Sequence, residues 1–258
     1  MNTSAGLASE TGEGGDTGPA GTIPAGSALV IAIDGPSGSG KSSASRGAAR
    51  ALGLRYLDTG ATYRALTCWM LEHGVDIADP DPVAAHVHDA RIEVGTDPAD
   101  PWTRVDGTDV SAAIRTREVT GAVSAVARVP VVREYLIALQ RDIISRSVID
   151  CGGIVAEGRD IGTVVAPDAA IKVFLTADGA ARASRRAAEA SWSADATRVE
   201  QDRRDSMDAA QSGKAGDATE IDSTTLSLDQ VIDAIVQLAE RIPPPRHVVK
   251  TVDKTREN

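Results

Sequence analysis

The chain has 258 residues, enough for one large α/β domain or two small domains, and 42% of them are hydrophobic. Only 3% are aromatic, so aliphatic side chains must supply most of the core. A formal net charge of −10 argues against a non-specific nucleic-acid binder or a membrane-surface binder. The two cysteines, Cys68 and Cys151, suggest neither a zinc site nor a disulfide scaffold, and they suit a reducing cytoplasm. No apolar run has membrane-spanning length, and the N-terminus does not look like a secretory signal.

A glycine-rich loop stands between a predicted strand at residues 28–33 and a predicted helix at residues 43–52. Its glycines let backbone N–H groups approach an anion, and the positive end of the following helix adds to the attraction. Lys41 supplies a point charge for the β and γ phosphates, and the Ser42 hydroxyl is a hard oxygen ligand suited to Mg²⁺. The loop fits the pattern G-x-x-x-x-G-K-[ST] of a phosphate-binding loop with the residues Gly35-Pro36-Ser37-Gly38-Ser39-Gly40-Lys41-Ser42. An ordinary turn is the alternative, but the strand, the loop and the helix agree.

After this loop the alternation of strands and helices continues and is then interrupted. A short strand is predicted at residues 54–57, and a helix begins near Ala61, with a buried stripe formed by Tyr63, Leu66 and Met70. Four prolines break the alternation between residues 75 and 117. Within that region, residues 91–94 and 102–105 alternate like a small antiparallel hairpin, and Asp106-Gly107 is a turn signal. Helical patterns return at about residues 118–127 and 131–144.

The second half restores the alternation, which predicts an α/β fold with a mostly parallel sheet covered by helices. Strands are expected at residues 153–156, 170–175 and 220–222, and helices at about 178–190 and 228–241, with Ser223, Thr224 and Thr225 as N-cap candidates. Ligands bind such sheets at the carboxyl ends of the strands. That edge would gather the glycine-rich loop, residues 58–60 and residues 157–160. Taken alone, the last two stretches could also be a plain turn and a solvated loop.

These motifs resemble the bacterial cytidylate kinases, a family of nucleoside monophosphate kinases, from about residue 28 to residue 241. The resemblance rests on four motifs in order: Asp34-Gly-Pro-Ser-Gly-Ser-Gly-Lys-Ser-Ser43, Asp58-Thr-Gly-Ala-Thr-Tyr-Arg64, Asp109-Val-Ser-Ala-Ala-Ile-Arg115 and Glu157-Gly-Arg-Asp-Ile-Gly-Thr-Val-Val165. It implies a core sheet carrying a substrate-binding insertion at about residues 67–146 and a short lid at about residues 182–210. The tails, residues 1–27 and 242–258, are polar and are expected to be disordered or flexible.

The resemblance also implies an activity, in which ATP and Mg²⁺ serve to phosphorylate CMP or dCMP. It assigns the ATP phosphates to Gly35, Pro36, Ser37, Gly38, Ser39, Gly40, Lys41, Ser42 and Ser43, and the CMP phosphate to Thr59, Arg64 and Arg159. Ser124 and Arg133 would read the base, with a plain helix surface as their alternative, and Asp160 would face the nucleoside. Arg204 would lie near the transferring phosphoryl group and Asp208 at the sugar. Glu157 or Asp34 could hold a water molecule bound to Mg²⁺.

The chain departs from the family pattern after Asp208, because Gln211 stands where the family has an arginine, and Lys214 is a possible substitute. Arg182, Arg185 and Arg186 are candidates for ATP contacts, with surface solvation as the equal alternative. Two other functions stay open: a kinase for another small acceptor, and a nucleotide-binding regulator without turnover. Small-molecule nucleotides are the expected partners, with no nucleic acid and no membrane. A monomer is the default.

Overall fold

The computed structural model describes residues 29–190 and 213–242, and for residues 186–190 it describes the backbone only. The expected N-terminal tail, most of the expected lid and nearly all of the C-terminal tail lie outside these residues. Their bounds, and those of the expected insertion, stay predictions.

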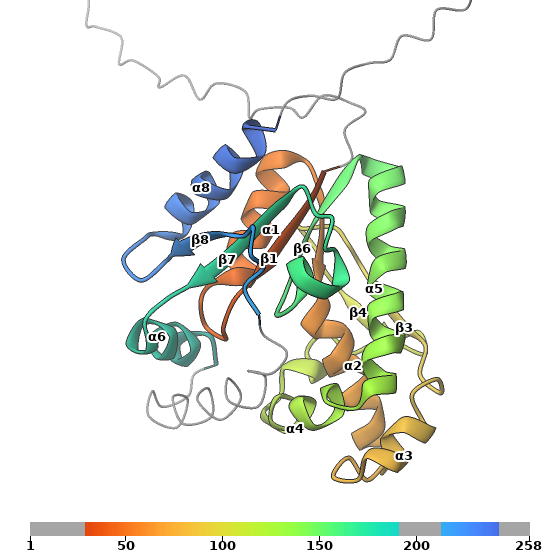
Figure 1. Ribbon diagram of the computed structural model, residues 1–258. Coiled ribbons are helices and arrows are strands. Elements are labelled where there is room, and N and C mark those ends of the chain that lie inside the picture. The colour runs from red at the N-terminus through yellow and green to blue at the C-terminus, as the bar shows by residue number, and fades with distance from the viewer. Residues whose placement is uncertain (1–28, 191–212, 243–258) are drawn as a thin grey trace, which may run out of the picture.

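A five-stranded parallel sheet forms the centre of the molecule, in the order β2-β6-β1-β7-β8 (Figure 1). Its strands are β1 (Leu29–Asp34), β2 (Arg55–Asp58), β6 (Gly153–Gly158), β7 (Ile171–Thr176) and β8 (Thr219–Asp222). The central β1 and β6 are apolar on both faces, as expected for strands that are covered on both sides. The predicted α/β fold with a parallel sheet is confirmed.

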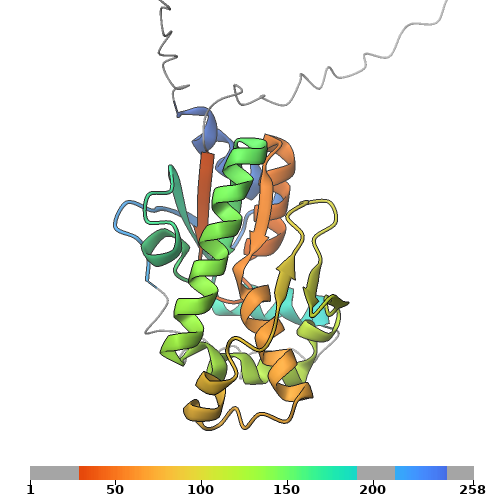
Figure 2. The same cartoon turned by 90° about the vertical axis from the view of Figure 1, so that its right-hand side faces the viewer.

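Helices cover both faces of this sheet. On one face, α1 (Lys41–Leu52) and α8 (Leu228–Glu240) pack side by side over aliphatic residues of β1 and β7. On the other face lie the long α5 (Pro130–Cys151) and a single turn of π-helix, η2 (Ile161–Val165), as Figures 1 and 2 show. After β7 the chain enters α6 (Gly179–Ala190). This layering leaves the carboxyl edge of the sheet open to the loops that follow the strands.

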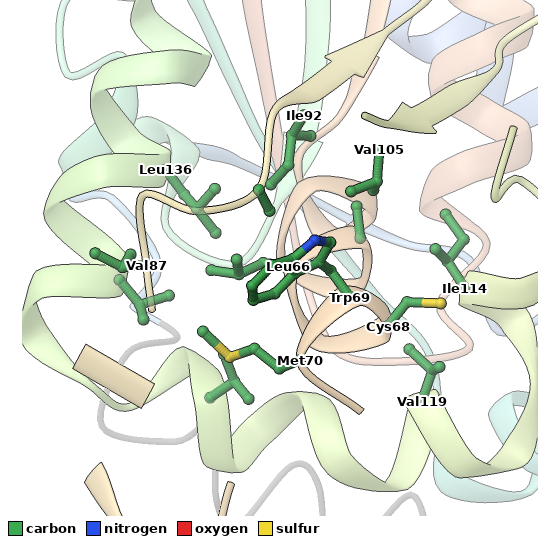
Figure 3. Packing of buried hydrophobic residues seen from close by; sticks show 14 of the residues in the cluster. Leu66, Cys68, Trp69, Met70, Val87, Ile92, Val105, Ile114, Val119 and Leu136 are labelled. Carbon is green, nitrogen blue, oxygen red and sulfur yellow. The ribbon is translucent and has the colours of Figure 1, made fainter. Parts of the chain in front are cut away.

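The region between β2 and β6 forms a second apolar core below the sheet (Figure 3). Leu66 and Met70 of α2 are fully buried in it, whereas Tyr63, the third member of the predicted stripe, is only partly buried. The elements around this core are α2 (Thr59–Glu72), α3 (Pro80–Ala85), β3 (Ile92–Val94), β4 (Thr103–Val105), β5 (Thr108–Asp109), η1 (Ala113–Arg115) and α4 (Arg117–Ala127). This second core positions α2 and α4 beside the open edge of the sheet.

The predicted hairpin of β3 and β4 is present, and Asp106-Gly107 turns the chain into a further short strand, β5. Asp106 has a φ of 51° and Gly107 a φ of 82°, the left-handed pair that a tight two-residue hairpin turn requires. The strand β5 was not predicted, because two residues are too few to show an alternating pattern.

Two helix boundaries differ from the sequence prediction. The helix α5 continues to Cys151 and ends at Gly152, whose φ is 78°, although the apolar pattern fades after Ile144. Its last turns bury the small Ser147 and leave Ile149 exposed, so they carry no apolar stripe. The helix α8 is capped by Ser227, not by the predicted residues 223–225, because Ser227 and Gln230 form a reciprocal capping box.

Candidate active site

Three polar stretches meet where parallel strands end. In the register of the sheet, Asp34 of β1 stands beside Gly158 of β6, and Asp58 of β2 stands beside Glu157. The glycine-rich loop, residues 58–60 and residues 157–160 therefore share one edge, as the sequence predicted. Glu157 and Asp160 are 3% and 7% exposed, so the alternative of a solvated loop does not fit this stretch.

The glycine-rich loop is shaped by backbone angles that only glycine adopts easily. Gly38 and Gly40 have φ values of 77° and 91°. At Gly35, whose φ is 149°, a Cβ atom would stand 2.1 Å from the carbonyl oxygen of Leu175, so β7 leaves no room for a side chain. The helix α1 then begins at Lys41 with no side chain capping its first N–H groups. These donors and the positive helix end make the loop a site for an anion.

Lys41 lies inside this loop, and its ammonium group donates a hydrogen bond to the Pro36 carbonyl oxygen over 2.8 Å. Burial and the neighbouring Arg159 lower the pKa of Lys41 to about 8, while Glu157, Asp34 and Asp58 oppose the shift. An anion bound in the loop would place a negative charge next to the Lys41 ammonium group and stabilise its charged form. The site is therefore organised for a ligand that brings negative charge.

Glu157 is the central buried carboxylate of the site. Its Oε1 accepts a hydrogen bond from the Tyr56 hydroxyl over 2.5 Å, and it also pairs with the Ser42 side chain. Burial raises the pKa of Glu157, and the nearby Asp58 adds to the rise, while Lys41, Tyr56 and Ser42 hold it down. A carboxylate and a hydroxyl thus stand together at the mouth of the loop, and both are hard oxygen donors.

Asp34, the second buried carboxylate near the loop, accepts hydrogen bonds from backbone N–H groups. Its two carboxylate oxygens accept the backbone N–H groups of Ile161 and Gly162, each over 2.8 Å. Burial raises the pKa of Asp34, although both N–H groups favour the charged form. Asp34 therefore holds the π-helical turn η2 against the end of β1. Glu157, which contacts Ser42, is the better placed of the two for a bound metal's water.

Asp58 and Arg64 form an ion pair at the start of α2. One oxygen of Asp58 caps the helix through the Ala61 N–H, and the other accepts from Arg64 over 2.7 Å, with Arg115 at 3.7 Å. Although burial pushes the pKa of Asp58 up, the two arginines and the Ala61 N–H hold it below its usual value. The Nε of Arg64 is buried and has no hydrogen-bond partner. The hydroxyl of the buried Thr59 donates to the Glu157 carbonyl oxygen over 2.7 Å.

Arg133 of α5 and Asp160, just beyond β6, form a close ion pair through Oδ2 of Asp160. Burial alone would lower the pKa of Arg133, but the hydrogen bond to Asp160 and the negative charge of that carboxylate raise it above its usual value. Ser124 is 3% exposed on the inner face of α4, so the plain helix surface is excluded for it. Arg159, partly buried, lies close enough to Lys41 to affect its pKa.

Two predicted lid arginines contact the loop itself. From α6, Arg182 donates to the Ser37 carbonyl oxygen over 3.1 Å, and Arg185 donates to that of Ser39 over 3.4 Å. Surface solvation is therefore wrong for both. Lys214 pairs with Glu220 at 2.7 Å on the exposed side of β8 instead of facing the site. The Arg186 side chain, Arg204, Asp208 and Gln211 lie outside the described residues.

Three residues that contact this site were not among the predicted site residues: Tyr56, Arg115 and Ser223, whose hydroxyl lies 3.0 Å from the Ser39 carbonyl oxygen. Asp109-Val-Ser-Ala-Ala-Ile-Arg115 was a recognised motif, so a signal for Arg115 existed, whereas Tyr56 read only as a strand residue. Among residues 29–190 and 213–242, no group of three or more His, Cys, Asp or Glu residues gathers as a metal site. No helix in that part of the chain is long and apolar enough to cross a membrane.

Comparisons with known proteins show which family the sequence matches. The family model of cytidylate kinase matches residues 31–241. A cytidylate kinase from Streptomyces griseus is 52% identical over 219 residues, which cover 83% of this chain and 94% of that protein. One from Streptomyces coelicolor is 52% identical, covering 85% and 96% of the two chains, and one from Rhodococcus opacus is 48% identical, covering 81% and 94%. A solved gluconokinase from Sinorhizobium meliloti 1021 aligns with a TM-score of 0.43 and 14% identity, covering 83% and 93%, a likeness too weak to bear on function.

Proposed function

Because the chain belongs to the cytidylate kinase family, we propose that it transfers the γ-phosphoryl group of ATP to CMP and dCMP, giving CDP and dCDP for pyrimidine nucleotide metabolism. One observation carries the proposal for this chain. The anion-binding loop with Lys41 and the arginines Arg64 and Arg159 stand at the same edge of one sheet, on neighbouring strands and their loops. Such an edge can present two phosphorylated ligands to each other.

The glycine-rich loop would hold the phosphates of ATP through its backbone N–H groups, Lys41 and the start of α1. The donor set fits this ligand, since the first turn of α1 has no side-chain cap and the loop has no side chain at Gly35, Gly38 and Gly40. Ser42, with Glu157 acting through a water molecule, would hold Mg²⁺. The pair fits a hard cation because both offer oxygen atoms. When bound, Mg²⁺ neutralises charge on the β and γ phosphates.

The phosphate of CMP would bind between Thr59, Arg64 and Arg159. The partnerless Nε of Arg64 supports this assignment, because a buried guanidinium N–H without an acceptor is costly until a ligand oxygen arrives. Asp58 holds the same guanidinium from the other side and fixes its direction. Arginine forks bind phosphate oxygens in pairs, so they add geometry as well as charge.

The base would be read by Ser124, Arg133 and Asp160. Cytosine offers an exocyclic amine donor beside two acceptors, so a hydroxyl and a guanidinium can serve the acceptors and a carboxylate the amine. The ion pair between Arg133 and Asp160 orients that carboxylate. Uracil would turn a carbonyl oxygen toward the same carboxylate, which is a repulsive contact and a source of selectivity.

Phosphoryl transfer needs alignment of donor and acceptor and neutralisation of the equatorial oxygens, with little covalent help from the protein. Lys41 and Arg159 would supply that charge from the described residues. The family resemblance adds Arg204 at the transferring group and Asp208 at the sugar. Exclusion of water would fall to the proposed lid at about residues 182–210, with the insertion at about residues 67–146 holding CMP.

A coupled assay of ADP release tests the proposal, with ATP and Mg²⁺ against CMP, dCMP, UMP, AMP and shikimate. We expect CMP and dCMP to be turned over well above the other acceptors. Turnover of another acceptor in their place would make the chain a different small-molecule kinase. ATP binding without any turnover would make it a regulator. Asp160→Asn removes the charge but keeps the shape, and it should reduce the difference between the turnover of CMP and the turnover of UMP.

We further propose that the protein acts as a cytoplasmic monomer with nucleotides as its small-molecule partners. Its two cysteines, Cys68 and Cys151, are free thiols, which suits a reducing compartment, and the loop, Arg64 and Arg159 belong to one chain. Light scattering at micromolar concentration, with and without both nucleotides, would give a mass near 26.7 kDa under this proposal. A mass of twice that value would contradict it.

A further inference from the structure

The outer side of the glycine-rich loop is held by a serine from the other end of the chain. Ser223, in the turn between β8 and α8, is 1% exposed. Its hydroxyl lies 3.0 Å from the Ser39 carbonyl oxygen and 2.9 Å from that of Thr176. Arg185 of α6 donates to the hydroxyl of Ser223 over 2.9 Å and to its carbonyl oxygen over 2.5 Å. Residues separated by up to 184 positions thus converge on one carbonyl group of the loop.

The orientation of that carbonyl controls a ligand-binding N–H. In a trans peptide, the C=O of Ser39 and the N–H of Gly40 point in opposite directions, and the chain has no cis peptide bond among its described residues. A carbonyl turned outward to Ser223 and Arg185 therefore turns the Gly40 N–H toward the interior of the loop. Gly40 has a φ of 91° and no Cβ, so rotation of this peptide meets little steric resistance. An external restraint is needed to keep it fixed.

The Ser223 hydroxyl does not cap a helix, and its two acceptors are the Ser39 carbonyl oxygen of the loop and the Thr176 carbonyl oxygen at the end of β7. It was a predicted N-cap of the last helix, but Ser227 caps α8 with its own capping box. The Ser223 hydroxyl instead points back to the ends of β7 and the loop. Arg182 holds the Ser37 carbonyl oxygen in the same way, so two peptides of the loop are restrained from outside. Both Ser223 and Ser39 are buried, so water cannot replace the hydrogen bond between them.

We propose that Ser223 is a positioning residue for ATP, which fixes the Ser39–Gly40 peptide so that the Gly40 N–H is directed at the nucleotide's phosphates. The inference rests on the proposed function, in which this loop binds ATP. Ser223 would not touch the nucleotide phosphates itself. Its loss removes the shorter of two contacts on the Ser39 carbonyl oxygen, 3.0 Å against 3.4 Å for Arg185, and so loosens the peptide. The cost falls on ATP binding, whereas CMP would bind to other residues.

The test compares Ser223→Ala with Ser227→Ala, which removes the same atom four residues later from an exposed helix cap. Folding is checked first by circular dichroism and melting. We expect Ser223→Ala to raise KM for ATP, and Kd for ATP by calorimetry, about three- to tenfold, the effect of one buried hydrogen bond. KM for CMP should stay within about twofold. Ser227→Ala should lower the melting temperature and leave both KM values unchanged.

An unchanged affinity for ATP in Ser223→Ala, or an equal rise in both KM values, would overturn the inference. If Ser223→Ala does not fold, Ser223→Cys carries the test, because a thiol has a similar shape and is only a weak hydrogen-bond donor. The same difference between KM for ATP and KM for CMP is expected. Absence of CMP turnover in the wild type would refute the proposed function alone. The calorimetric comparison of ATP affinities would still decide the role of Ser223.

Discussion

The hydrogen bond between Tyr56 and Glu157 joins β2 to β6 directly beneath the proposed phosphate site. Tyr56→Phe removes the hydroxyl and keeps the shape of a side chain that is 3% exposed. Hydrogen bonds to charged groups contribute about 1.5–3 kcal/mol, so we expect the free energy of unfolding to fall by about 2 kcal/mol. For a domain of this size, that loss lowers the melting temperature by about 4–8 °C.

The loss should also depend on pH in a direction that the structure fixes. Burial raises the pKa of Glu157 in the folded protein, so ionising it costs stability as pH rises through that folded pKa. The Tyr56 hydroxyl favours the ionised form and limits this cost. Without it the pKa of Glu157 rises further. Tyr56→Phe should therefore be more destabilising at pH 8 than at pH 5.5, where a larger fraction of Glu157 is protonated.

Denaturant unfolding of the wild type and the variant at pH 5.5, 7 and 8 measures this difference. Tyr135→Phe is the matched control, because the Tyr135 hydroxyl donates to a neutral acceptor, the Ala90 carbonyl oxygen, over 3.3 Å. It should cost less and show no comparable dependence on pH. A Tyr56→Phe variant as stable as the wild type at pH 8, or a deficit that is the same at every pH, would refute the account of Glu157.

Further predictions concern the loop and its neighbours. Lys41→Ala should abolish phosphoryl transfer yet melt within a few degrees of the wild type, because the Lys41 ammonium group donates its hydrogen bond to the Pro36 carbonyl oxygen of the loop itself; early melting with normal turnover would contradict this. With the pKa of Lys41 near 8, the affinity for ATP measured by calorimetry should fall as pH rises through about 8, and a flat profile to pH 9.5 would count against a charged lysine. Arg159→Ala should raise KM for CMP about tenfold or more and KM for ATP far less; an unchanged response to CMP concentration in steady-state kinetics would remove Arg159 from the acceptor site. Ser227→Ala should cost about 1 kcal/mol and lower the melting temperature by about 2–4 °C in a calorimetric scan, and a shift below 1 °C would mean that the capping box contributes little.

Local signals in the sequence predicted the parts of the fold whose causes are local. The strand, the loop and the helix at residues 28–52 follow from an apolar run, glycines at fixed spacing and good helix formers. The turn at Asp106-Gly107 follows from two residues that tolerate left-handed angles. The N-cap of α8 could also have been predicted correctly, because Ser227 and Gln230 have the spacing of a capping box.

Contacts between distant segments could not be read in the same way. Tyr56 and Glu157 are 101 residues apart, and although the sequence marks Glu157 as a candidate near a metal, nothing in it pairs Glu157 with a tyrosine inside another strand. The π-helical turn η2 depends on Asp34, which captures two N–H groups 127 and 128 residues later. The sequence indicates Ser223 as a helix cap, whereas in the structure its hydroxyl lies beside the Ser39 carbonyl oxygen of the glycine-rich loop. Strand order and register decide these pairings, and periodicity reveals neither.

The most direct measurement is a crystal structure of the wild-type protein with a non-hydrolysable ATP analogue, Mg²⁺ and CMP. We expect the triphosphate within the loop from Gly35 to Ser43, and the CMP phosphate between Arg64 and Arg159. A triphosphate bound anywhere else, or a CMP phosphate that neither arginine contacts, would contradict this expectation.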